Sequence, residues 1–311
     1  MAMAIATRVS HTYSFQNVLE TSKRVTWRED EVLSGRSFDL SRRFLPNRLS
    51  GVDDIEFLSA AEKRMLNQIM GIAYFHIFAF VEEFIVPAVS EQAMSNPYGD
   101  EVRLRSLVRF SEEELKHQEM FRRSIALFNE QFGATPQLIP GREAVAGVVR
   151  SKSTLAVLIL IDIIEWFVQV HYTEHVLADE ELDGLFRDLL KHHWLDEAQH
   201  AKIDTMLIAE LAEELPLAER EKAIDEVLEL GGAIDGLLQQ QIAMNVDALE
   251  VASGRSFTQS ERDEITASTL KAWRYTFLVS GLEHPNVVKL VNEITVDGPE
   301  KVRAVAAALS A

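Results

Sequence analysis

The stretches Ser111-Glu-Glu-Glu114-Leu-Lys-His117 and His193-Trp-Leu-Asp-Glu197-Ala-Gln-His200 decide how this sequence is interpreted, because each contains a Glu-x-x-His motif. Side chains three positions apart lie on the same side of a helix, so each motif presents one carboxylate and one imidazole to a common point. Two such helices, with one inward carboxylate from each of two others, form a carboxylate-bridged dimetal site in a four-helix bundle. The motifs therefore predict an all-α protein, provided that the other two carboxylates exist.

The composition favours helices and argues against several classes of protein. The 311 residues are 47% hydrophobic and 26% charged, with only 14 Gly and 8 Pro. The net charge of −18 argues against nucleic acid and membrane surfaces as partners. Without cysteine there is no disulfide, thiolate metal site or iron–sulfur cluster, which fits a reducing cytoplasm. Residues 1–11 lack the apolar core of a signal peptide, and the most apolar run, 155–170, is short for a membrane span. We therefore expect a cytoplasmic protein.

Capping and turn residues divide the chain into three parts. Residues 1–54 are weakly periodic and predict an N-terminal arm. Residues 55–215 predict the dimetal bundle, in which two helical hairpins are joined by one long crossover with a short helix before Ser153. The first bundle helix is expected to begin at a Ser59/Glu62 capping box and to end before Pro87. Residues 216–311 predict a C-terminal helical extension packed on the bundle. The other helices are expected over 101–132, 154–177, 183–215, 217–252, 260–281, 286–295 and 298–309.

Helical periodicity places both motifs on core-facing stripes. On the second bundle helix the stripe is Leu107, Phe110, Glu114, His117, Phe121, Ile125 and Phe128. On the fourth it is Phe186, Leu190, His193, Glu197, His200, Leu207 and Leu211. Glu113 falls outside the first stripe and is expected to face water. His193 is either a third imidazole at the site or a core histidine bonded to a backbone carbonyl. Asp204, one turn after His200, is placed to orient that ring or a bound water.

The two remaining carboxylate ligands are identified by their distance along the helix from the hairpin turn, because residues equally far from the turn on its two helices lie at the same level of the bundle. The midpoint of Glu165 and Glu197 falls in the turn over 178–184. Glu82 and Glu83 both lie level with Glu114 about the turn over 96–100. Helical direction separates them: Glu83 lies over Met65, whereas Glu82 lies over Arg64 on the polar edge. We therefore choose Glu83.

The predicted ligands are Glu83, Glu114, His117, Glu165, Glu197 and His200, with His193 as a seventh candidate. Four carboxylates neutralise two divalent cations, and oxygen-rich ligation suits iron or manganese better than zinc or copper. His171 and His175 lie one turn apart but away from the direction of Glu165, so surface or capping roles are expected for them. The alternative is a purely structural helical protein with buried acids, which would cost several kcal/mol without a partner for them.

Over residues 55–215 this ligand pattern resembles that of the ferritin-like di-iron oxygenases. The stretch from His193 to His200 is similar to the His-x-x-x-Glu-x-x-His helix of the para-aminobenzoate N-oxygenase family, whose extra histidine is a seventh protein ligand. In that family a di-iron centre activates dioxygen and oxidises an arylamine nitrogen. The resemblance implies two iron ions, with manganese as an alternative in one or both sites, held by Glu83, Glu114, His117, Glu165, His193, Glu197 and His200.

The function implied by the resemblance is that of a non-haem di-iron oxygenase. It would use dioxygen and an electron donor to oxidise a small organic substrate, with an (aryl)amine as the candidate, and the tail helices would cover the bundle or form a homodimer surface. The segment Asp196-Glu197-Ala-x-His200 also resembles ribonucleotide reductase small subunits and related ligand-binding Mn/Fe oxidases. That alternative needs a redox tyrosine near the metals, for which Tyr74 and Tyr172 are the candidates. Metal storage is disfavoured, since storage proteins are usually short chains of bundle size.

Overall fold

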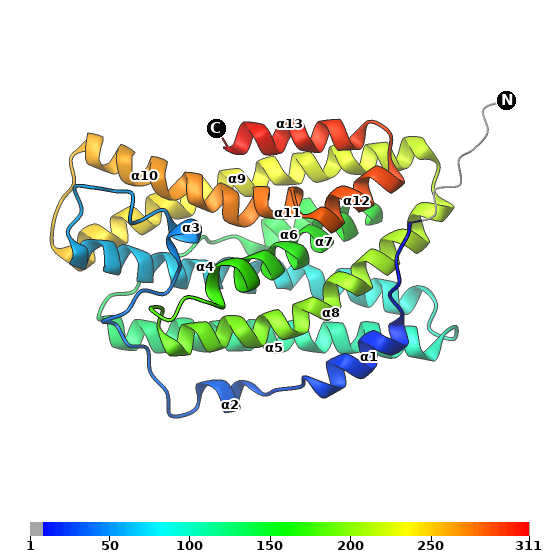
Figure 1. Cartoon of the computed structure of the whole chain (residues 1–311), viewed down its shortest axis with the longest axis horizontal. Helices are drawn as coiled ribbons and strands as arrows, with labels where there is room; N and C mark the ends of the chain where they lie inside the picture. The colour runs from blue at the N-terminus through cyan, green and yellow to red at the C-terminus, as the bar shows by residue number, and fades with distance from the viewer. Residues whose placement is uncertain (1–8, 311) are drawn as a thin grey trace.

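The computed structural model describes residues 9–310, apart from the side chains of residues 142 and 144. Within this range every regular element is a helix, and the one strand-like contact is an isolated bridge between Arg43 and Leu182. Figure 1 shows long helices stacked in layers along the longest axis of the molecule. The predicted all-α class is confirmed.

Four long helices lie at the centre: α4 (Ala60–Ser95), α5 (Glu101–Phe132), α7 (Thr154–Val170) and α8 (Gly184–Glu214). Helix α4 packs along α5 and α7 packs along α8, while α5 also contacts α8 and α4 contacts α7. The capping box of Ser59 and Glu62 begins α4 as predicted. Helix α5 has both predicted ends: Asp100 caps its first turn, and Gly133 follows it in the left-handed conformation.

Helix α4 does not end before Pro87 as predicted but continues to Ser95. A proline inside a helix lacks the N–H that would bond the carbonyl four residues earlier, which normally ends or kinks the helix. Beyond Pro87, however, Val89 and Ala93 are buried in the core. Burial of this last part of the helix outweighs the missing hydrogen bond, and sequence rules for helix ends do not include that contribution.

The N-terminal segment covers one face of the central helices. Helices α1 (Phe15–Arg24) and α2 (Glu29–Leu33) both contact α5 and α8, and Figure 1 shows them beneath these two helices. Helix α3 (Asn47–Ser50) contacts α10 on another side of the molecule. The predicted short helix in the long crossover is α6 (Arg142–Arg150), which packs against α4.

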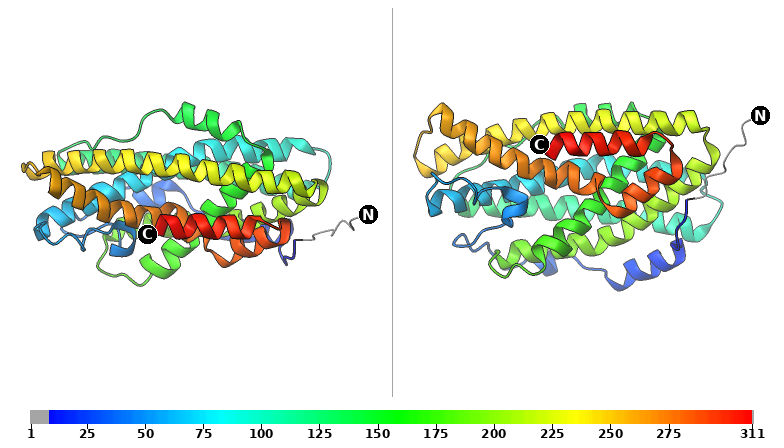
Figure 2. Two further views of the ribbon diagram at one scale, coloured as in Figure 1. Left: turned by 90° about the horizontal axis from the view of Figure 1, so that it is seen from above. Right: turned by 45° about the horizontal axis from the view of Figure 1, so that its top comes forward.

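The C-terminal helices lie along the opposite side of the central four (Figures 1 and 2). Helix α9 (Leu217–Ser253) packs on α4 and α7, and α10 packs on α9. Two π-helical segments, η1 after α7 and η2 after α10, contribute side chains to the interior. The bounds of the remaining elements are η1 His171–Val176, α10 Gln259–Arg274, η2 Tyr275–Val279, α11 Ser280–Leu282, α12 Pro285–Ile294 and α13 Gly298–Ser310.

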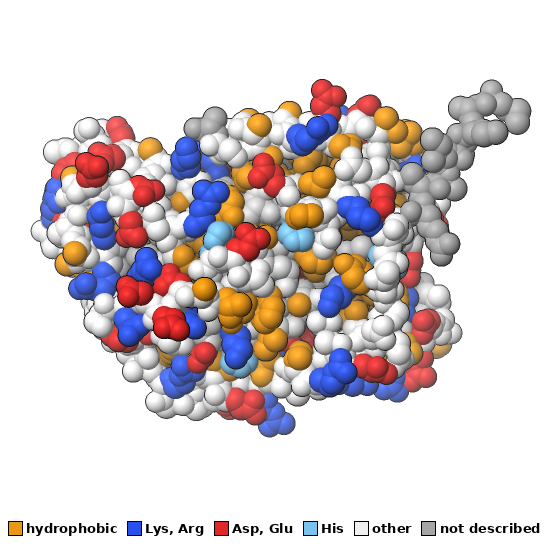
Figure 3. Space-filling model, in the orientation of Figure 1, with side chains coloured by type: hydrophobic (Ala, Val, Ile, Leu, Met, Phe, Trp, Pro, Cys, Tyr) orange, Lys and Arg blue, Asp and Glu red, His pale blue; other side chains and the backbone are white. Residues whose placement is uncertain are grey.

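Two helical segments, Ala60–Ser95 and Thr154–Val176, are long and apolar enough to cross a membrane by length and composition alone. In their most apolar windows, 72% and 89% of the residues are buried inside the protein. Core helices of soluble proteins pass the same test, so this is weak evidence for a membrane span. Figure 3 shows acidic and basic side chains interspersed with hydrophobic ones over one face of the molecule.

Candidate metal centre

Carboxylates and imidazoles from all four central helices come together in the interior. They form two groups, and in each group one possible ligand atom per residue lies within 4.8 Å of the others. Every member is at most 2% exposed. The first group is Glu82, His117, His193 and Glu197, and the second is Glu114, Glu165, Glu197 and His200. The protein therefore holds buried Glu/His groups that could bind metal ions at two adjacent positions.

Glu197 belongs to both groups, and its two oxygens face different ones. Its Oε1 lies 2.5 Å from His193 Nε2 and 3.2 Å from His117 Nδ1, while its Oε2 lies 2.5 Å from His200 Nδ1. Glu114 also spans the groups, with Oε1 2.8 Å from His200 Nδ1 and Oε2 3.8 Å from His117 Nδ1. Carboxylates in these two positions are placed to bridge a pair of metal ions.

The donor atoms of this cluster fit metal ligation because many of them, among residues 9–310, form no hydrogen bond of normal geometry and have only other possible ligand atoms as close polar neighbours. Both oxygens of Glu82 and of Glu114, and Oε2 of Glu165, lack such a hydrogen bond. So do Nδ1 of His117 and both ring nitrogens of His193. Buried polar atoms are nearly always hydrogen-bonded in folded proteins, so unpartnered atoms concentrated at one place need an explanation. Two divalent cations would supply partners and neutralise the four glutamates.

The charges in the cluster shift its pKa values strongly. Burial raises the pKa of Glu82 to about 8, and burial followed by repulsion from Glu197 and Glu114 raises that of Glu165 well above its usual range. Burial would also raise the pKa of Glu197, but neighbouring imidazoles, His193 first, hold it well below its usual range. Without metal, protons on the imidazoles thus balance part of the negative charge. Metal binding must displace these protons, so it becomes weaker at acidic pH.

In each motif, the histidine Nε2 contacts a carboxylate on the other helix, and that carboxylate belongs to the residue just before the Glu of the other motif. His117 Nε2 lies 3.1 Å from Oδ2 of Asp196, the residue before Glu197, and Lys116 Nζ lies 2.6 Å from the same oxygen. His200 Nε2 lies 3.1 Å from Oε2 of Glu113. With Nε2 donating to these carboxylates, Nδ1 of both rings faces the cluster. Such outer contacts fix ring orientation and tautomer in metal sites.

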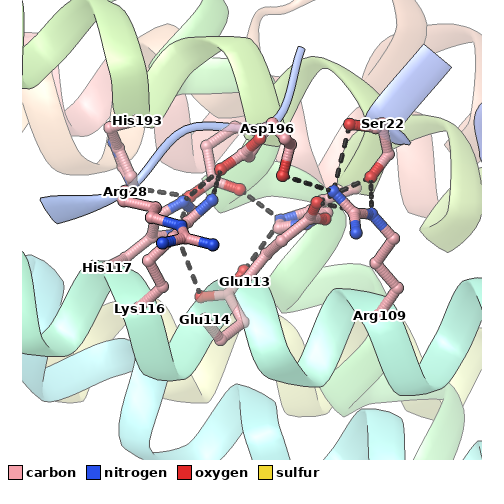
Figure 4. Close-up of polar contacts among 12 residues, drawn as sticks. Ser22, Arg28, Arg109, Glu113, Glu114, Lys116, His117, His193 and Asp196 are labelled. Carbon is pink, nitrogen blue, oxygen red and sulfur yellow. Dashed lines mark hydrogen bonds and ion pairs between the residues drawn. The ribbon is translucent and has the colours of Figure 1, made fainter. Parts of the chain in front are cut away.

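Glu113 is only 1% exposed, so the expectation that it faces water is wrong. Its Oε1 accepts a hydrogen bond of 2.6 Å from Ser22 Oγ on α1 and lies 3.0 Å from Arg109 Nε (Figure 4). The polar stripe of α5 that carries these residues would be exposed on an isolated bundle. Helix α1 covers this stripe, and the sequence of α5 alone does not indicate that another helix packs there.

The segment between α1 and α2 closes the same side of the cluster. The Trp27 ring stacks on His117, with centroids 6.0 Å apart and planes inclined by 13°. Lys116 Nζ lies 4.0 Å from the centre of the indole. The N-terminal arm therefore lies against the groups that hold both histidines. Ser22 contacts Glu113, which holds His200, and Trp27 packs beside Lys116, which pairs with Asp196, the residue that holds His117.

Glu83, the predicted ligand from the first bundle helix, lies outside both groups, and Glu82 takes that place. The side chain of Glu83 is 23% exposed and pairs with Arg122 at 2.8 Å. Met65 lies five turns from Glu83, where α4 has different neighbours, so the direction that they share does not identify the face of α4 at the metal-binding groups. The nearer core positions, one and two turns from Glu82, do identify its face: Phe75, Phe78, Ile85 and Val89 are all buried.

Asp204 and His171 are both buried. Neither oxygen of Asp204 has a hydrogen-bonding partner within residues 9–310, so Asp204 does not orient His200 by a direct hydrogen bond, and its contact with a bound water stays a prediction. Burial, followed by the charge of Asp162, raises its pKa well above the usual range. His171 is the C-cap residue of α7, which is one of the two roles expected for it, but it is buried rather than at the surface. Its Nδ1 lies 2.7 Å from the Tyr74 hydroxyl and its Nε2 2.8 Å from the Thr276 carbonyl oxygen. His175 is half-buried and contacts the Tyr275 hydroxyl.

No protein-family model matches this chain, and no curated protein is significantly similar to it in sequence.

Proposed function

We propose that this protein is a ferritin-like dimetal-carboxylate oxidoreductase that activates dioxygen to oxidise a small organic molecule. The observation that carries the proposal is the position of Glu114 and Glu197, each of which faces both metal-binding groups. Glu82 and Glu165 complete the pattern of two Glu-x-x-His helices and two helices with one inward carboxylate each. That pattern is the dimetal-carboxylate arrangement of ferritin-like bundles.

The two metal positions would differ in their ligands. Glu82, His117 and His193 would hold one ion, Glu165 and His200 would hold the other, and Glu114 and Glu197 would be shared. The predominance of oxygen donors favours iron, or manganese in one or both positions. Bound there, the metal ions would supply the electrons and open coordination positions needed to reduce dioxygen.

The chain itself orients the imidazoles and excludes water. Asp196 and Glu113 keep a proton on Nε2 of His117 and His200, which leaves each Nδ1 free to bind metal. Phe110 stacks on the His200 ring with centroids 3.8 Å apart, while Phe78 and Phe121 meet the edge of His193 at 4.9 and 5.0 Å. These phenyl rings keep the surroundings of the site apolar, which limits side reactions with water.

The resemblance to para-aminobenzoate N-oxygenases supports an amine nitrogen as the group that is oxidised. The additional imidazole of His193, which lies in the first group, is the feature shared with that family. An electron donor, a cytoplasmic location and a homodimer are parts of the same proposal.

The proposal is tested by loading the full chain with ferrous iron without oxygen and then adding dioxygen. The protein should bind two irons, consume dioxygen and develop a transient visible absorption band. Glu197→Ala should lose all three properties, because it removes the carboxylate common to both groups. A wild-type protein that binds no more iron than Glu197→Ala would contradict the proposal.

A second candidate function, a radical-generating oxidase like the reductase small subunits, is favoured by the contact of Tyr74 with His171. The phenol is buried and has a fixed hydrogen-bonding partner at 2.7 Å. Its ring lies 4.7 Å from Phe78, whose ring lies 4.9 Å from His193. A stable tyrosyl radical after oxidation, seen by electron paramagnetic resonance and lost in Tyr74→Phe, would favour this candidate. Oxidation of an amine without such a signal would favour the first.

A further inference from the structure

An apolar cavity of about 210 Å³ lies away from the metal centre, on the other side of α4. Phe80 and Phe84 of α4 line it, whereas Glu82 between them points to the metal-binding groups. Its remaining walls come from α6 and the loop before it, from Leu160 of α7, and from α9. The cavity and the metal centre therefore share two helices, α4 and α7, but no side chain.

The lining of the cavity excludes charged ligands. No Asp, Glu, Lys or Arg is among the described residues that line it, and His76 is its one polar side chain. The Nε2 atom of His76 lies 3.0 Å from the carbonyl oxygen of Ile139, and burial lowers the pKa of the ring, so the imidazole is neutral near pH 7. A water molecule needs two to four polar partners to be held in a cavity, and these walls offer few.

The size of the cavity indicates the size of a ligand. A dry apolar cavity of about 150 Å³ is large enough to bind benzene. We propose that this cavity binds an uncharged, largely hydrocarbon molecule somewhat larger than benzene, such as a bicyclic aromatic. The proposal does not rest on the metal centre or on the proposed function.

Access to the cavity is provided by α6. Val145, Val148 and Val149 of this helix form part of the wall, and Val148 is 47% exposed. Figure 2 (left) shows α6 at the periphery, at the end of the long connection from α5. Gly141, which precedes α6, has a φ of +90°, a conformation that suits glycine. The cavity therefore reaches the surface beside α6 and α9, where the lining residues Val148 and Ala233 are exposed.

The test is calorimetric titration of the full chain with naphthalene and, separately, with its charged relative 2-naphthoate. Naphthalene should bind with and without bound iron, and 2-naphthoate should bind far more weakly because no cationic side chain is among the described lining residues. Ala233→Phe, at an exposed lining position of α9, should weaken naphthalene binding by about tenfold or more, since the new ring fills the space. Val149→Phe, from the α6 side, should have the same effect.

Ala243→Phe is the matched control, because Ala243 is also exposed on α9 but does not line the cavity. It should bind naphthalene as the wild type does. The proposal is overturned if naphthalene does not bind up to its solubility limit. It is also overturned if both filling variants bind naphthalene as tightly as Ala243→Phe, or if 2-naphthoate binds as well as naphthalene. None of these results depends on metal binding, so they leave the proposed function untouched.

Discussion

Glu113 Oε2 and His200 Nε2 lie 3.1 Å apart, and this contact connects the N-terminal arm to the metal centre. On its other oxygen Glu113 accepts a hydrogen bond from Ser22 of α1. His200, whose Nδ1 faces the candidate metal site, is thus held through one carboxylate by a helix 178 residues earlier in the chain, the separation between positions 22 and 200. The arm is therefore part of the site's support.

Glu113→Ala is expected to weaken iron binding at the His200 position by roughly 10- to 100-fold, because the ring loses the partner that fixes its orientation. Competition with a chromogenic chelator measures this affinity. Glu112→Ala is the matched control, since Glu112 is exposed on the same turn of α5. If the two variants bind iron equally well, Glu113 does not support the site.

Glu82→Gln and Glu83→Gln distinguish the two neighbouring acids. Glu82→Gln should lower the iron content of the protein, because an amide is a poorer ligand than a carboxylate. The metal-free protein should tolerate this change within about 1 kcal/mol, because burial raises the pKa of Glu82 to about 8 and already keeps it neutral at pH 7. Glu83→Gln should keep the wild-type iron content. The opposite pattern, measured by elemental analysis, would restore Glu83 as the ligand.

Trp27→Ala should lower the free energy of unfolding by about 3 kcal/mol, because it removes a large side chain that is only 6% exposed. It should also let a chelator extract iron faster, since the ring covers His117. Trp27→Phe should recover much of both properties. Denaturant unfolding and stopped-flow chelation provide the two measurements. An unchanged extraction rate in Trp27→Ala would show that the arm does not close the site.

His171 predicts a dependence of stability on pH. Burial lowers its folded-state pKa to about 3 from the ordinary 6.5, so below pH 6.5 the unfolded chain takes up a proton that the native ring does not. The contribution of this group to the free energy of unfolding is therefore fully present above pH 6.5 and is lost as the pH falls toward 3. Between pH 7 and pH 5 the free energy of unfolding should fall by about 2 kcal/mol because of this group. His171→Gln should lack this component. Denaturant unfolding of metal-free wild type and variant at both pH values tests it, and parallel losses would contradict the assignment.

Periodicity and turn positions predicted a large part of the fold and of the candidate site. The ends of α5 and the inward direction of Glu114, His117, Glu197 and His200 follow from patterns within single helices. Glu165 followed from its level in the hairpin, because a short turn fixes the register of the two helices that it joins. These features depend on residues close in sequence or on one tight connection.

The features that could not be predicted depend on distant parts of the chain. Glu113 is buried because α1 covers it, and His171 is buried between segments distant in sequence, with Tyr74 of α4 and Thr276 of η2 contacting its two nitrogens. Glu82 was within reach of the sequence, since Phe75, Phe78 and Ile85 mark its face at one- and two-turn spacing. Residues five turns away, such as Arg64 and Met65, do not mark this face, because α4 has different neighbours there.

The most direct test of the metal centre is anomalous X-ray diffraction at the iron edge from crystals loaded with ferrous iron without oxygen. The structure predicts two peaks per chain, about 3.5–4 Å apart as in other two-metal sites. Glu114 and Glu197 should lie between the peaks, with Glu82, His117 and His193 around one and Glu165 and His200 around the other. A single peak, or no anomalous density among these side chains, would contradict the account.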